Sequence, residues 1–236
     1  MKSVVYEVGK KALCFLDLAS KRHANLCKKL ENSENYYVSC LHDSDFKARF
    51  FKCEIASTAF VLALLARLGS DEFDMLDEGY LSAESCLGEE EAVEILDFLN
   101  EAEFLIIDTN LKEHKDYENI LFFCAFLAHK FKLKFAFSDE SEEELLVQDT
   151  FRHLKELDNY DGLVLFRLKN KDKFLHCSQQ FSQIAKINDK ANILIESELF
   201  KLESKLVCDE SLNTIIAFLD FDTKGYDFVR VKLTKI

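Results

Sequence analysis

The stretch FLIIDTNLKEHKDYENILFFCAFLAHKFKLKFAF, residues 104–137, decides the fold prediction. It opens on four consecutive apolar residues, 104–107, a pattern typical of a buried parallel strand. Residues 117–131 then show helical periodicity, and a second apolar run fills residues 133–137. A strand, a helix and a strand in this order predict one βαβ unit with a right-handed crossover.

The alternation continues on both sides of this unit. Upstream, the patterns predict strands at residues 4–8 and 36–41 and helices at residues 11–30, 55–68 and 89–100; downstream, they predict a helix at residues 142–157 and a strand at residues 163–168. Residues 55–68 are apolar nearly all round, which indicates a helix buried on several sides. The predicted fold class is α/β, with an open, mostly parallel sheet and helices on both faces.

Beyond residue 160 the pattern changes. Residues 178–187 favour a short helix, whereas residues 193–196, 214–219 and 228–233 favour strands. We therefore predict an α/β Rossmann-like domain over residues 1–160 and a smaller strand-rich C-terminal part over residues 161–236.

Composition indicates a globular, cytoplasmic protein. Hydrophobic residues make up 48% of the 236 residues, and 22 of them are Phe. The longest apolar stretch, residues 55–68, is shorter than the roughly 20 residues that span a bilayer, and the N-terminus has no secretory signal pattern. The eight cysteines lie at least 13 residues apart, mostly in apolar segments, so we expect reduced, buried thiols.

Motifs for common cofactors are missing from the sequence. No two of the six glycines are closer than nine residues, which excludes the dinucleotide fingerprint and the P-loop. No cysteine pair has the two-to-four-residue spacing of zinc and iron–sulphur sites. The lysines are scattered among acids, without the basic stripe that nucleic acid requires. We therefore expect no catalytic residues, no metal site, no cofactor and no nucleic-acid partner.

One short motif brings potential metal ligands or nucleophiles together. The residues Cys40-Leu41-His42-Asp43-Ser44-Asp45 follow a predicted strand and carry a thiol, an imidazole and two carboxylates. A solvated turn is the competing interpretation and the one that we favour, because a single short motif is weak evidence for a metal or nucleophile site.

All of the excess negative charge lies in residues 68–111, which hold 14 Asp and Glu and no Lys or Arg, against 29 acids and 30 bases elsewhere. We interpret residues 79–91, at its centre, as a loop entering a helix. A basic protein surface is the partner that charge complementarity predicts. The predicted contact residues are two apolar and four acidic ones: Tyr80, Leu81, Glu84, Glu89, Glu90 and Glu91. A merely solubilising loop is the alternative.

Residues 79–137 resemble the molybdopterin-oxidoreductase-like region of the large subunit of bacterial respiratory complex I. In that family a strand is followed by Asp-Leu, two variable residues, His-Pro, a small residue and Asn at a helix start. Leu111, His114 and Asn119 match this pattern, whereas Asn110, Lys115 and Tyr117 depart from it. The region is catalytically vestigial in the family, and the departures argue against carrying over any pterin-binding role.

The resemblance implies a short replacement subunit of a complex I-like NADH-quinone oxidoreductase. Its expected function is a cofactor-free docking subunit of the peripheral arm, without catalytic activity alone, that helps a donor such as flavodoxin to replace NADH in electron transport. The implied partners are the large subunit and other peripheral-arm subunits, and the implied location is the cytoplasmic face of the inner membrane, without a membrane span.

A second function stays open. Open α/β sheets usually bind ligands at the carboxyl ends of their strands. A free-standing small-molecule-binding protein or enzyme would place its site near Asp108-Thr109-Asn110 and Ser138-Asp139.

Overall fold

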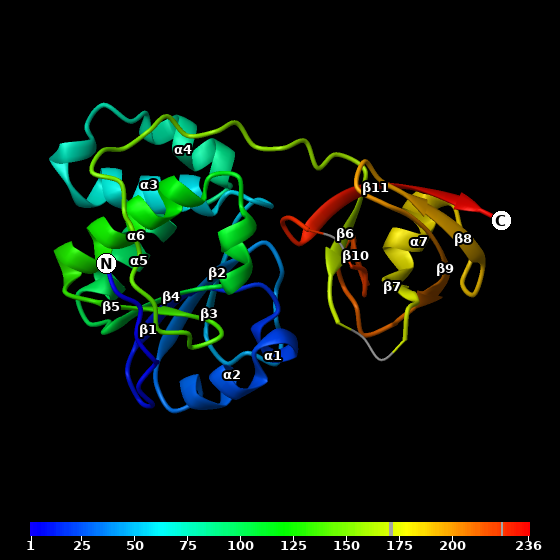
Figure 1. Cartoon of the computed structure of the whole chain (residues 1–236), viewed down its shortest axis with the longest axis horizontal. Coiled ribbons are helices and arrows are strands. Elements are labelled where there is room, and N and C mark those ends of the chain that lie inside the picture. Colours follow the sequence, from blue (N-terminus) through cyan, green and yellow to red (C-terminus); the bar gives the residue numbers. More distant parts are fainter. Residues whose placement is uncertain (170–171, 223) are drawn as a thin grey trace. The chain divides into compact units, whose positions relative to one another are not determined.

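The computed structural model describes residues 1–169, 172–222 and 224–236. Within them the chain forms two compact units, Met1–Leu157 and Asp158–Ile236 (Figure 1). The sequence places this boundary near residue 160. Each unit has a hydrophobic core of its own, so each is described separately.

The first unit is built on a five-stranded parallel sheet. Its strands are β1 (Ala12–Phe15), β2 (Asn35–Ser39), β3 (Arg49–Lys52), β4 (Phe104–Ile107) and β5 (Lys134–Phe137), in the order β3-β2-β1-β4-β5. Every neighbouring pair is parallel. From β1 the chain builds the sheet outward in one direction through β2 and β3, and in the other direction through β4 and β5. Ligands of such sheets usually bind at this switch point, at the carboxyl ends of β1 and β4.

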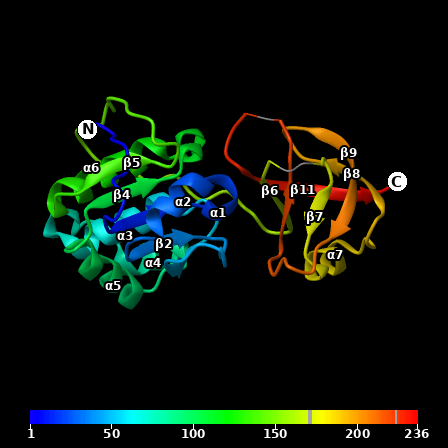
Figure 2. The same ribbon diagram turned by 90° about the horizontal axis from the view of Figure 1, so that it is seen from below.

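Helices cover both faces of this sheet, which confirms the predicted fold class. On one face lie α1 (Ala19–Arg22) and α2 (Ala24–Leu30), drawn below the sheet in Figure 1 and in front of it in Figure 2. On the other face lie α3 (Thr58–Gly69), α4 (Glu78–Ser85), α5 (Glu89–Leu99) and α6 (Tyr117–Phe131), with short 3-10 turns η1 (Asp71–Phe73) and η2 (Thr109–Glu113). The parallel β4–α6–β5 arrangement is the predicted βαβ unit.

Helix α3 is the packing centre of the second face. Its residues from Thr58 to Ala66 are all buried, and it contacts α4, α5 and α6. This agrees with a segment that is apolar nearly all round.

Four local predictions are wrong. Residues 11–30 form β1, α1 and α2 rather than one helix, and residues 4–8 form no strand. Residues 142–157 form no helix, although their periodicity is helical. Residues 79–91 hold most of helix α4 and the start of α5 instead of a loop, because Asp77 caps α4 by accepting a hydrogen bond from Tyr80 N at 2.9 Å.

The second unit is a closed six-stranded barrel. Its elements are β6 (Leu163–Arg167), β7 (Leu175–Cys177), α7 (Gln179–Ala185), β8 (Asn192–Glu196), β9 (Lys201–Cys208), β10 (Ile216–Leu219) and β11 (Phe228–Lys235). The strand order around the barrel is β10-β6-β11-β8-β9-β7. The predicted strand-rich C-terminal part is thereby confirmed. The sequence patterns did not predict strands β7 and β9.

Candidate functional site

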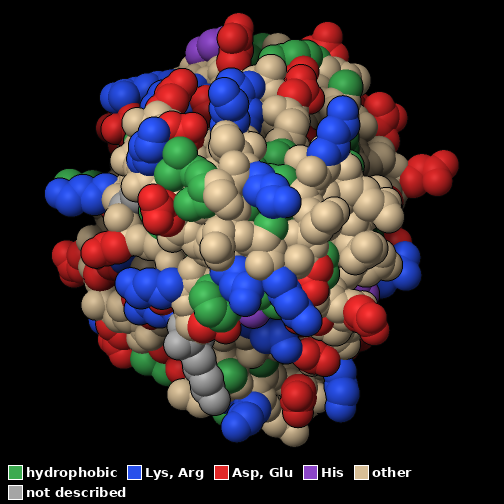
Figure 3. All heavy atoms as spheres, turned by 90° about the vertical axis from the view of Figure 1, so that its right-hand side faces the viewer, with side chains coloured by type: hydrophobic (Ala, Val, Ile, Leu, Met, Phe, Trp, Pro, Cys, Tyr) green, Lys and Arg blue, Asp and Glu red, His purple; other side chains and the backbone are tan. Residues whose placement is uncertain are grey.

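The excess charge of the protein belongs to the first unit. Residues 1–157 contain 31 acids and 18 bases, whereas residues 158–236 contain 12 of each. Acidic and basic side chains are accordingly mixed on the face drawn in Figure 3. A charge-guided interaction therefore points to the first unit, and within it to helices α4 and α5.

Local sequence fixes the start of α5 and thus the direction of its charges. Glu89, Glu90 and Glu91 occupy the first turn, where the helix dipole favours anions. Glu91 also accepts a hydrogen bond from Gly88 N at 3.0 Å, which ties its carboxylate to the helix start. Glu91 therefore has a structural role, whereas Glu90 is free to face solvent.

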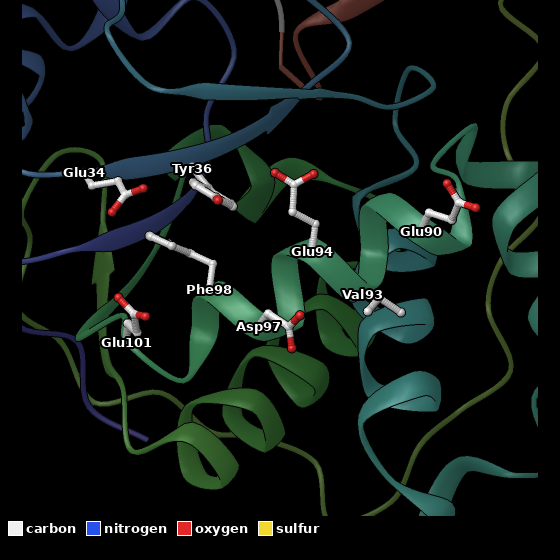
Figure 4. Close-up of a pocket in the computed structure, with 8 residues that line it drawn as sticks. All are labelled: Glu34, Tyr36, Glu90, Val93, Glu94, Asp97, Phe98 and Glu101. Atoms are coloured by element: carbon white, nitrogen blue, oxygen red, sulfur yellow. The ribbon is translucent and has the colours of Figure 1, made fainter.

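An acidic groove of about 460 Å³ runs between α5 and the start of β2. Its lining consists of five acidic and three apolar or aromatic residues, Glu34, Tyr36, Glu90, Val93, Glu94, Asp97, Phe98 and Glu101 (Figure 4). The α5 members recur at helical spacing, which places them on one face of the helix. Tyr36 and Phe98 stack with ring centroids 3.9 Å apart, so the groove has an aromatic wall.

Basic side chains neutralise part of this groove. The Lys11 ammonium lies 3.0 Å from Glu34 and 2.7 Å from Glu101, and these two carboxylates raise the pKa of Lys11. Arg49 pairs with Glu94 at 3.3 Å. Glu90 and Asp97 have no ion pair within the described residues, so the unbalanced charge of the groove lies on these two side chains.

The same imbalance extends over residues 68–111. Nine of the 14 acids form no ion pair with a described residue; they are Asp71, Glu72, Asp77, Glu78, Glu84, Glu89, Glu90, Glu91 and Asp97. Three large apolar side chains of this stretch are exposed, Met75 at 74%, Tyr80 at 48% and Val93 at 47%. Carboxylates beside exposed apolar groups form a surface that suits a basic partner with an apolar contact.

The predicted contact residues divide into exposed and buried ones. Tyr80 is half exposed, Glu84 is partly buried, and Glu89, Glu90 and Glu91 are exposed. Leu81 is only 1% exposed, so its side chain belongs to the core and the expectation that it contacts a partner is corrected. In helix α4 the two neighbours Tyr80 and Leu81 point to different sides of the helix.

Sequence reasoning missed most of the groove. The recurrence of residues 90, 94, 97 and 101 at helical spacing was a signal that could have located its α5 side. Glu34 and Tyr36 carried no such signal, because only the fold brings the start of β2 to α5.

The strand-end residues form a second candidate site, centred on Asp108. This carboxylate is 1% exposed and lies 3.2 Å from His23 Nε2, 3.2 Å from Ser138 Oγ and 3.4 Å from an Arg22 nitrogen. Burial acts to raise the pKa of Asp108, but the His23 hydrogen bond and the Arg22 charge outweigh it and hold the pKa below its usual value. The carboxylate thus joins the ends of β4 and β5 to the α1–α2 junction.

Most polar groups of this cluster bond to one another. Ser138 Oγ accepts from Thr109 N at 2.9 Å, and Asp139 accepts from the Ser141 hydroxyl at 2.8 Å. His23 joins the cluster through Nε2, which lies 3.2 Å from Asp108 Oδ1, and its side chain is 14% exposed.

The three residues that carry the family resemblance have structural roles. Leu111 is buried in η2. His114 Nε2 donates to Ala56 O at 3.0 Å, and its Nδ1 accepts from Asp116 N at 3.0 Å. Asn119 donates to Asp116 Oδ1 at 2.7 Å and, through its Oδ1, accepts from Gln148 and Arg152, so it holds the irregular segment 148–155 against α6.

The Cys40–Asp45 motif does not converge on a common point. Asp43 accepts hydrogen bonds from the Ser20 backbone and hydroxyl, both at 2.7 Å, and His42 packs against the Phe50 ring. Burial raises the pKa of the Cys40 thiol well above its ordinary value. The residues of the Cys40–Asp45 motif therefore stabilise a turn. Within the described residues, no group of three His, Cys, Asp or Glu side chains has the arrangement of a metal site.

Comparison with known protein families found no matching family, and comparison with curated proteins found no matching relative. Among the described residues, no helix is long and apolar enough to cross a membrane.

Proposed function

We propose that this protein is a docking subunit without chemistry of its own, which presents the acidic surface of α4 and α5 to a basic protein surface. The observation that carries the proposal is the groove of Glu90 and Asp97, unpaired within the described residues and placed beside an aromatic wall. Unpaired carboxylates repel one another, and a basic partner relieves that repulsion on binding. Tyr80 and Val93 add exposed apolar area to the same surface.

The partner in this proposal comes from the sequence resemblance. It is the large subunit, with other peripheral-arm subunits, of a complex I-like quinone oxidoreductase at the cytoplasmic side of the inner membrane. The protein would help a donor such as flavodoxin to deliver electrons in place of NADH. Because flavodoxins are generally acidic, the acidic surface would face the complex, and the donor would approach elsewhere.

The test is purification of the tagged protein from gently solubilised native membranes, followed by mass spectrometry of its companions. The proposal expects stoichiometric complex I subunits, lost in the double variant Glu90→Lys/Asp97→Lys. Both side chains are exposed and neither caps a helix, so the fold is retained. Reversal replaces attraction by repulsion, so affinity falls at least about tenfold, equivalent to about 1.4 kcal/mol.

The matched control reverses the same amount of charge on the second unit. In Glu198→Lys/Glu210→Lys, two exposed acids change and the net charge of the chain becomes the same as in the groove variant. Unchanged recovery in this control, with loss in the groove variant, assigns the contact to the groove. Equal loss in both variants, or recovery of a lone soluble protein, would contradict the proposal.

A free-standing small-molecule-binding protein is the second candidate, favoured by the His23–Asp108 pair. Asp108, His23 and Ser138 gather polar side chains at the carboxyl ends of β4 and β5, where open α/β sheets usually bind small molecules. Native mass spectrometry of the purified chain would reveal such a molecule, and His23→Ala would release it. A mass spectrum without bound species at micromolar protein would count against this candidate.

A further inference from the structure

Cys177 and Cys208 are direct partners in the barrel. They are opposite one another in the parallel pairing of β7 with β9, which also aligns Leu175 with Leu206. Neighbouring strands lie about 4.8 Å apart, and partners in a parallel pair point to the same face. That face is the barrel interior, since Cys177 belongs to the hydrophobic core and Cys208 packs against it.

The two thiols interact electrostatically, and they differ in access to solvent. Cys177 is fully buried, whereas Cys208 is partly exposed at the end of β9. Burial, with a smaller contribution from Cys208, raises the pKa of Cys177 to about 12. A reagent from solvent therefore meets Cys208 first.

We propose that Cys177 and Cys208 are a redox modification site, at which a peroxide closes a reversible disulfide between β7 and β9. The spacing of the strands lies within the roughly 4.4–6.8 Å between Cα atoms that a disulfide accepts. The sequence, in contrast, predicts reduced, buried thiols, and 30 residues separate Cys177 from Cys208 along the chain.

The reaction balances with one equivalent of hydrogen peroxide. The Cys208 thiol loses its proton, and the thiolate sulphur attacks one peroxide oxygen; the O–O bond breaks, a sulfenic acid forms, and the departing hydroxide takes up the released proton as water. The Cys177 sulphur then attacks the Cys208 sulphur, an S–S bond replaces the S–O bond, and a second water leaves with the Cys177 proton. Two thiols are oxidised and one peroxide is reduced to two waters.

The bond formed in this way is easy to reduce. Cβ atoms of a disulfide lie about 3.8 Å apart, closer than the spacing of two parallel strands, so closure pulls β7 and β9 together. Strained disulfides have the more oxidising potentials that characterise labile, regulatory bonds. A thiol such as dithiothreitol therefore restores the reduced barrel.

The test treats the reduced, purified full chain with a small molar excess of hydrogen peroxide, then alkylates free thiols under denaturing conditions and maps the tryptic peptides. The expected product is a single linked species joining residues 174–186 to residues 206–224, which disappears after dithiothreitol. Cys86 is the internal control for accessibility, because its thiol is exposed to the reagent. It lies at the end of helix α4 and, within the described residues, has no paired cysteine on a neighbouring strand.

Two variants make the result decisive. Cys86→Ser is expected to leave the linked peptide unchanged. Cys208→Ser, at a partly exposed position, is expected to abolish the linked peptide and to leave Cys177 reduced. The proposal is overturned if both thiols of the wild type remain alkylatable while Cys86 is consumed. It is equally overturned if Cys208 proceeds to sulfinic acid without a link to Cys177.

Discussion

Replacement of Asp108 by Asn tests whether the strand-end cluster holds the first unit together. The carboxylate is 1% exposed and accepts from His23 and Ser138, with the Arg22 charge 3.4 Å away. Asp108→Asn keeps the shape of the side chain but removes the buried negative charge that lies 3.4 Å from the Arg22 guanidinium. Removing one partner of a buried ion pair costs about 3–5 kcal/mol. For a unit of this size that cost lowers the melting temperature by roughly 6–20 °C.

The effect also has a defined pH dependence. Because the folded-state pKa of Asp108 lies below its usual value, its stabilisation is complete above the unfolded-state pKa of about 3.9 and is lost as the pH falls through the folded-state pKa. The difference in free energy of unfolding between wild type and Asp108→Asn is therefore largest at neutral pH. It becomes smaller only in strong acid.

Urea unfolding followed by circular dichroism, at neutral pH and in acid, measures both quantities. Asp97→Asn is the matched control, since Asp97 is exposed and forms no ion pair within the described residues; it is expected to change the free energy of unfolding by less than about 0.5 kcal/mol. A loss below about 1 kcal/mol for Asp108→Asn at neutral pH, or a difference that widens on acidification, would refute the reasoning.

Three further predictions concern the same unit. Asn119→Ala removes the hydrogen bonds that hold residues 148–155 and is expected to lower the free energy of unfolding by about 2–3 kcal/mol. Amide hydrogen exchange is expected to become faster in that segment only, and an equal increase throughout the first unit would argue against an anchoring role. Cys86→Gly is expected to stabilise by about 1 kcal/mol, as measured by urea unfolding, because Cys86 ends α4 with φ of 54° and glycine adopts this conformation without strain. Tyr80→Ala is expected to leave the melting temperature nearly unchanged while Leu81→Ala costs about 2–5 kcal/mol, since only Leu81 is buried; equal effects would place both residues in the core.

The match between prediction and structure follows the length and regularity of each element. Helix α6 begins and ends where the periodicity predicts, at Tyr117 and Phe131, because 15 residues give an unambiguous pattern. Strand β1 was missed because its four residues, Ala12–Phe15, are buried on both faces and merge with the apolar residues of the following helices. In residues 142–157, periodicity alone predicted a helix, but side-chain anchors from α6 and the N-terminus hold the segment in an irregular path.

The sequence by itself determined the alternation of strands and helices, the change of pattern near residue 160 and the local origin of the negative charge. These are properties of neighbouring residues, which periodicity and composition record directly. The tertiary structure decided the strand order, the closure of the barrel, the groove between Glu34 and Glu101, and the meeting of Cys177 with Cys208. Each of these joins residues far apart in the chain, and strand pairing and register depend on the whole core instead of on any local pattern.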